Sequence, residues 1–140
     1  GGGARPGDLK SPIRVGGGTI FGPVPRDYGF KLNKKVKQLA RKSALSLRAK
    51  QNELLVLDAL NFDAPKTKAM VEVLNALQVA EKKVLFVVAD ANLNARKSAA
   101  NIQRVNVVNV NELNTYTIMN SNVVVLTEAS AAAIEATLNA

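Results

Sequence analysis

Cysteine and histidine are both absent from this 140-residue sequence, and so is tryptophan. Without cysteine the chain has no disulfide bonds and no thiolate nucleophile, and without both residues it lacks the usual zinc ligands. Histidine is also the commonest general base near neutral pH. We therefore expect a protein that is not an enzyme and that needs no metal ion or other cofactor.

Long apolar runs are missing as well. The longest, residues 84–89, has the length of a strand and falls far short of the roughly 18 residues of a membrane-spanning helix. The N-terminus lacks the basic and then apolar composition of a signal peptide. We expect a soluble, cytoplasmic protein with one domain and no membrane partner.

Glycine is confined to one end of the chain. All nine glycines and four of the five prolines lie in residues 1–31, which favours extended loop over helix or central strand. Disordered linkers are usually poor in aromatic residues, but this segment contains Phe21, Tyr28 and Phe30. We expect an extended arm, residues 1–31, followed by a globular domain, residues 32–140.

Charge is distributed just as unevenly. The net charge is +8, but residues 1–50 contain twelve Lys or Arg against two acids, whereas residues 51–140 contain seven against nine. A nearly neutral globule therefore follows a strongly cationic segment. This asymmetry points to a nucleic-acid partner, or less often to an anionic membrane surface.

The spacing of apolar residues predicts an amphipathic helix from residue 32 to about residue 47. Its apolar stripe, which we expect to pack on the core, consists of Leu32, Val36, Leu39, Ala40, Ser43, Ala44 and Leu47. Its outward cationic face consists of Lys34, Lys37, Arg41 and Arg48, flanked by Lys35 and Lys42. A membrane-surface helix is disfavoured because the core needs the stripe.

The remainder alternates apolar runs with helical patterns. Strands are predicted at 53–57, 84–89, 105–110 and 123–127, and helices at 65–77, 93–102, 113–119 and 130–138. Continuous apolar strands separated by helices are typical of a parallel sheet that is covered on both faces. We predict a three-layer α/β/α domain with a mostly parallel sheet of about four strands, in an order that the pattern does not determine.

Three features could form a site. The cluster Gly16–Gly18 does not precede a helix and lacks a following Gly-Lys-Ser/Thr, which favours a turn or a close approach to RNA phosphates over nucleotide binding. Asp58, Asp90 and Glu128 follow predicted strands, so they either line a ligand site or simply cap helices and face solvent. The aromatic residues of the arm could stack on unpaired bases, although we expect Phe30 to lie in the core.

The segment GGGTIFGPVPRDYGFKLNKKVKQLARKSALS (Gly16–Ser46) is followed along the chain by APKTK (64–68) and LNTYTIMNSNVVVLTEAS (113–130). In content and order these segments resemble the signature and the later characteristic segments of the bacterial large-subunit ribosomal protein L4 family. The resemblance implies a structural, primary binder of 23S-type rRNA that supports large-subunit assembly beside neighbouring ribosomal proteins. It further implies a long loop in the wall of the polypeptide exit tunnel, and no small-molecule substrate.

Carried over by position, the resemblance assigns rRNA contacts to Arg5, Lys10, Ser11, Arg14, Gly16, Gly17, Gly18, Phe21, Arg26, Tyr28, Lys34, Lys35, Arg41 and Lys42. The chain has Arg14-Val15 where the family usually has Trp-Arg, and Ala100 where it has Arg. It starts within the long loop, so we expect that the family's N-terminal segment is not represented and that residues 1–31 are the returning limb. The alternative is a free RNA-binding regulator with an α/β core.

Overall fold

The computed structural model describes residues 2–3, 5, 7–89 and 93–139. Asp90, one of the three candidate carboxylates, lies outside the described residues. Contacts divide the chain into two units, residues 1–31 and residues 32–140.

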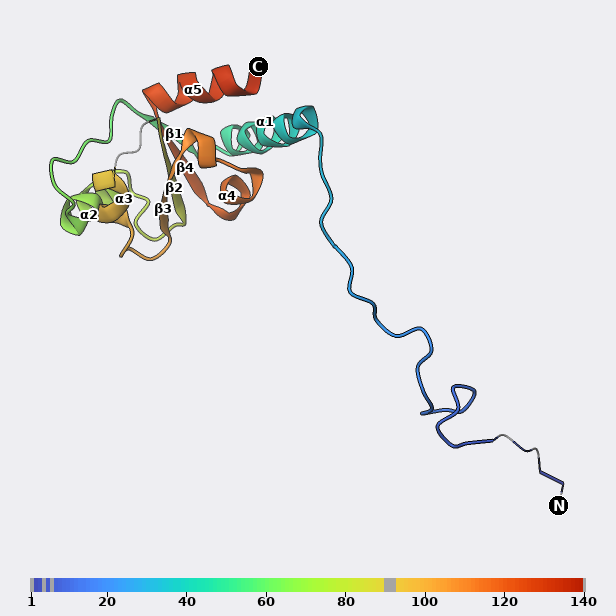
Figure 1. Ribbon diagram of the computed structural model, residues 1–140. Coiled ribbons are helices and arrows are strands. Elements are labelled where there is room, and N and C mark those ends of the chain that lie inside the picture. Colours follow the sequence, from blue (N-terminus) through green and yellow to red (C-terminus); the bar gives the residue numbers. More distant parts are fainter. Residues whose placement is uncertain (1, 4, 6, 90–92, 140) are drawn as a thin grey trace. The chain divides into compact units, whose positions relative to one another are not determined.

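Within the described residues, four strands form one parallel sheet in the second unit (Figure 1). They are β1 (Leu54–Leu57), β2 (Val84–Val88), β3 (Val105–Asn109) and β4 (Val123–Thr127). The spatial order is β1-β4-β2-β3, so the last strand in the chain is inserted between the first two. This answers the question of strand order that the sequence pattern left open.

Strand β2 shows why the strands read as continuous apolar runs. All five of its residues are buried, and successive side chains point to opposite faces of the sheet. Phe86 joins the core on one face, whereas Leu85 and Val87 join the core on the other. A strand covered on both sides has no solvent face, so it contains no alternating polar residues.

Helices complete the three layers (Figure 1). One face is covered by α2 (Thr67–Ala76) and α3 (Leu93–Ala99). The other is covered by α1 (Lys34–Lys50), α4 (Thr115–Asn120) and α5 (Glu128–Asn139), with a short 3-10 turn, η1 (Val110–Glu112). The predicted α/β/α architecture is confirmed.

The predicted element bounds are close to the observed ones. Helix α3 is shorter than predicted, since it ends at Ala99 and not at Ile102. Helix α5 begins at Glu128, directly after β4, and not at Ser130. The carboxylate of Glu128 therefore lies in the first turn of a helix, where negative charge is favourable.

The predicted inward face of α1 is wrong. Leu32, Val36, Leu39 and Leu47 are exposed, and the residues that turn inward are Gln38, Arg41, Ala44, Leu45 and Arg48. By helical spacing these two sets lie on opposite sides of the helix. Only Ala44 of the predicted stripe is buried.

Polar contacts explain this orientation. The guanidinium of Arg48 donates from Nε to the carbonyl of Ile118 (3.3 Å) and from Nη2 to that of Met119 (2.8 Å), and it pairs with Glu53. Gln38 donates to the carbonyl of Thr137 (3.2 Å). These side chains satisfy carbonyl groups near the ends of α4 and α5, which a leucine could not do.

The first unit contains no helix or strand among its described residues. Its large apolar side chains are exposed, and Phe30 is among them, with 82% of its surface accessible. The expectation that Phe30 lies in the core is therefore wrong. The residue precedes α1 in a stretch without regular structure, and Leu32, close to it in the sequence, is itself exposed.

Candidate nucleic-acid interface

A compact turn of residues 8–18 gathers six of the candidate residues. Backbone N–H groups of Ser11, Arg14 and Gly17 donate to the carbonyls of Asp8, Ser11 and Arg14, and Gly18 N–H donates back to Lys10 (2.9 Å). These bonds fold the segment upon itself. The residues brought together are Lys10, Ser11, Arg14, Gly16, Gly17 and Gly18.

The glycines of this turn have a steric role. Gly16 has a φ of +78°, in the left-handed region that side chains disfavour. A Cβ atom on Gly17 would lie 2.0 Å from the carbonyl oxygen of Ser11. The turn therefore requires glycine at position 17, which the glycine cluster in the sequence suggested without specifying the position.

Arg14 has unused hydrogen-bonding capacity in this turn. Its side chain is half-buried, and its Nε atom is buried without a partner in the described residues. A guanidinium presents several donors in a planar fork that fits phosphate oxygens. Arg14 is therefore a candidate for a phosphate contact through the other donors of its guanidinium.

A second local arrangement joins Arg26 and Tyr28. The guanidinium carbon of Arg26 lies 4.4 Å from the centre of the Tyr28 ring, in a cation–π contact. Between them, Asp27 accepts a hydrogen bond from the N–H of Gly29 (2.8 Å). The remaining arm candidates, Arg5 and Phe21, are exposed.

Helix α1 supplies the other four candidates. Lys34, Lys35 and Lys42 are exposed, and Lys42 donates to the side-chain oxygen of Asn139 (3.2 Å). Arg41 is half-buried on the inward side, where it lines a hollow of about 260 Å³ with Lys37 and residues 111–115. Lys37 was predicted to lie on the cationic face but was not a candidate rRNA contact. Because it lines this hollow with Arg41, it becomes a further candidate.

The positive charges of the first fifty residues are almost all unpaired. Among the described residues there are two ion pairs, Arg48–Glu53 and Arg96–Glu112, so one of the twelve cations in residues 1–50 has an acidic partner. Asp8 and Asp27, the acids of this segment, instead accept hydrogen bonds from backbone N–H groups in turns. An unneutralised surface of this kind attracts polyanions.

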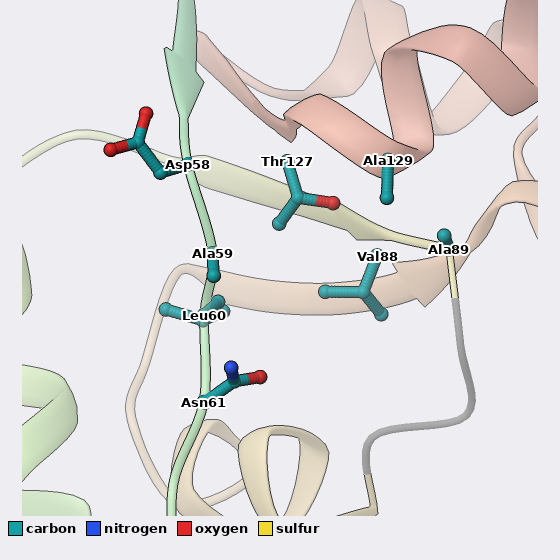
Figure 2. A pocket seen from close by; sticks show the side chains of 8 residues that line it. All are labelled: Asp58, Ala59, Leu60, Asn61, Val88, Ala89, Thr127 and Ala129. Atoms are coloured by element: carbon teal, nitrogen blue, oxygen red, sulfur yellow. The ribbon is translucent and has the colours of Figure 1, made fainter.

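The carboxyl edge of the sheet gives little support to a carboxylate site. A hollow of about 130 Å³ at this edge is lined by Asp58, Asn61 and Thr127 and otherwise by small or apolar side chains. Figure 2 labels all of these residues, among them Ala59, Val88 and Ala129. The carboxylate of Asp58 points away from these side chains. The described residues contain no group of three His, Cys, Asp or Glu arranged to hold a metal ion.

The exposed apolar stripe of α1 bears on whether this helix could lie on a membrane surface. We expected this stripe to be buried and for that reason disfavoured a membrane-surface helix, but Leu32, Val36, Leu39 and Leu47 are exposed. A separate finding concerns spanning: none of the described helices combines the length and apolarity that crossing a bilayer requires.

A family profile and individual relatives both match this sequence, and they agree on one family of ribosomal proteins. The sequence profile of the ribosomal protein L4/L1 family matches residues 1–137. The chain is 57% identical over 135 residues to the large ribosomal subunit protein uL4 of Bacteroides fragilis, and 54% identical over 135 residues to that of Phocaeicola vulgatus. Each match covers 96% of this chain and 65% of the relative, so the chain spans about two thirds of the length of these relatives.

Proposed function

Because the chain belongs to the ribosomal protein L4/L1 family, we propose that it is a structural constituent of the large ribosomal subunit and binds 23S-type rRNA. In this proposal it acts in the cytoplasm, supports subunit assembly and contacts neighbouring large-subunit proteins. Residues 1–31 are the returning limb of a loop that contributes to the polypeptide exit tunnel, and residues 32–140 are the globular domain. The protein acts by binding and not by catalysis.

The unpaired cations of the first fifty residues carry the proposal. Lys and Arg that neutralise phosphates release condensed counterions, which gives strong and salt-dependent affinity. Eleven of these twelve cations have no acidic partner among the described residues, so their charge is available to RNA.

The geometry of the arm indicates how it contacts RNA. In the turn of residues 8–18, glycines keep side chains away from the backbone, and Arg14 has a donor without a partner. This combination suits a close approach to phosphate oxygens. The exposed rings of Phe21 and Tyr28 suit stacking on bases that are not paired. Phosphate contacts then position the protein, and stacking adds to the affinity.

The experiment that tests the proposal is binding of the full chain to large-subunit rRNA over a salt series. For single strands, each neutralised phosphate contributes roughly −0.7 to the slope of log K against log salt concentration. The double variant K34Q/K35Q removes two exposed cations of α1. We expect it to reduce the magnitude of the slope by about 1 or more.

The matched control is K66Q/K68Q, which removes two exposed lysines from the acidic part of the chain. Its slope should equal that of the unmodified protein. Equal slopes for both double variants would contradict the proposed role of α1. A protein that washes off large subunits at moderate salt, yet binds one isolated RNA tightly, would be the free regulator and not a subunit component.

A further inference from the structure

The amino ends of β2 and β3 carry a second cationic surface, outside the arm and α1. We call it the amino-edge patch and define it by Lys82, Lys83, Arg104, Asn106, Tyr116 and Asn120. All six side chains are exposed. Five of the six, all except Lys82, line one hollow of about 250 Å³ together with the adjoining strand ends.

Positive charge is concentrated at this patch. Residues 51–140 contain seven cations and nine acids, and three of those cations are Lys82, Lys83 and Arg104. The nearest acid in the sequence is Glu81, and no acid lines the hollow. The remainder of this part of the chain therefore has four cations against nine acids, so the patch is a basic area on an acidic background.

Arg104 is held in position by its backbone. Its φ is +67°, an uncommon conformation for a residue with a side chain. Its carbonyl accepts the N–H of Val84 (2.9 Å), at the first rung between β2 and β3, and its Nη1 donates to the carbonyl of Glu81 (3.2 Å). The guanidinium is thus fixed beside the hollow and still has donors for an anion.

Tyr116 adds an aromatic surface to the same hollow. Helix α4 turns Ile118 into the core, and this orientation leaves Tyr116 in solvent with 73% of its surface exposed. The capping box of Asn114 and Thr117 fixes the first turn of the helix, on which Tyr116 lies. The amide groups of Asn106 and Asn120 line the hollow beside it.

We propose that the amino-edge patch is a second RNA-binding site, which takes an unpaired nucleotide by stacking its base on Tyr116 and pairing its phosphate with Lys83 and Arg104. The inference rests on the proposed function and assigns to the globular domain a contact of its own. Cations beside an exposed ring suit single-stranded or looped RNA, since every base offers a face for stacking. The asparagine amides provide donors and acceptors for base edges.

The test that locates the contact is chemical protection of lysines. The full chain, free or bound to large-subunit rRNA, is acetylated briefly, and the modified lysines are identified by mass spectrometry. We expect Lys83 to be protected by the rRNA, together with Lys34 and Lys35 of α1. Lys66 and Lys68, exposed and outside the patch, are the internal control and should react equally in both samples.

A variant series tests the role of the ring. We expect Tyr116→Ala to weaken rRNA binding at least fivefold, in the lower part of the range for loss of one stacked base (about 5- to 150-fold). Tyr116→Phe keeps the ring and should bind like the unmodified protein. Circular dichroism of both variants checks that the domain is folded.

The outcomes separate this inference from the proposed function. Protection of Lys34 and Lys35 without Lys83 overturns the second site and leaves the proposed function standing. Absence of protection at all three lysines overturns the proposed function itself. Protection of Lys83 in assembled large subunits but not on rRNA alone means a protein partner, and it overturns the inference. Equal weakening by Tyr116→Ala and Tyr116→Phe overturns the stacking role.

Discussion

The two units of this chain make turns in different ways. Residues 1–31 contain every glycine, and the turn of residues 8–18 depends on two of them. The α/β domain contains none, yet Asn52, Gln78 and Arg104 have positive φ. Asn52 and Gln78 follow the ends of α1 and α2 and bond back to the last turn of those helices. Where packing determines the backbone, a side chain is tolerated in the left-handed region, whereas the arm needs glycine.

The same contrast holds for phenylalanine. Phe86 in β2 is 1% exposed and contributes to the core, whereas Phe21 in the arm is 96% exposed. Burial of apolar surface stabilises the domain, so residues that bury none should contribute nothing to its stability. The arm's apolar side chains are therefore available for binding, and this difference can be tested directly.

The largest effect is expected at the core. Phe86→Ala should lower the free energy of unfolding by about 3–5 kcal/mol, since it removes a fully buried ring and leaves a cavity. Phe21→Ala is the matched control and should change it by less than about 0.5 kcal/mol. Urea unfolding followed by circular dichroism measures both. A measurable loss of stability in Phe21→Ala would mean that the arm packs on the domain.

The next effect is expected at Arg48. Replacement by methionine keeps the apolar stem but removes the donors to Ile118, Met119 and Glu53, and should cost about 2 kcal/mol. Lys50→Met, at an exposed position on the same helix, should be nearly neutral. The same urea titration distinguishes the two. If Arg48→Met is also neutral, the inward polar contacts do not determine how α1 packs.

Arg48 also shows where sequence reasoning failed. The two central strands, β2 and β4, could be predicted because continuous apolar runs leave one plausible arrangement, with both faces covered. Helix α1 has apolar residues on two sides, and hydrophobicity favoured the side with Leu32, Val36 and Leu39. The observed side is determined by carbonyl groups of α4 and α5, which are distant in sequence and carry no local signal.

A smaller and local effect is expected at Gly17. A Cβ atom there would meet the Ser11 carbonyl oxygen at 2.0 Å, so Gly17→Ala should open the turn of residues 8–18. Gly22→Ala is the control, because nothing lies within 4 Å of its Cβ position. NMR amide shifts should change across the turn in the first variant only, and rRNA affinity should fall with them. The urea midpoint of the domain should be unaffected in both.

For the candidate rRNA contacts too, the sequence indicated some features and only the structure shows others. Charge and glycine content indicate which segment is the candidate for RNA binding, because both are properties of composition. The arrangement within that segment could not be predicted, since a glycine cluster permits a turn but does not specify which backbone groups the turn joins, here the N–H of Gly18 and the carbonyl of Lys10. The stacking of Arg26 on Tyr28 and the inward position of Arg41 are likewise visible only in the structure.

The smallest effect is expected on the exposed side of α1, and it decides which face of the helix packs. Leu39 is 68% exposed, so Leu39→Gln should change the free energy of unfolding by less than about 0.5 kcal/mol. Leu45 is partly buried against the core, and Leu45→Gln should cost about 1 kcal/mol or more. The two variants make the same chemical change on the same helix, so composition alone cannot separate them. A larger loss for Leu39→Gln would mean that the stripe of Leu32, Val36, Leu39 and Leu47 is covered in the folded protein, as the sequence pattern predicted.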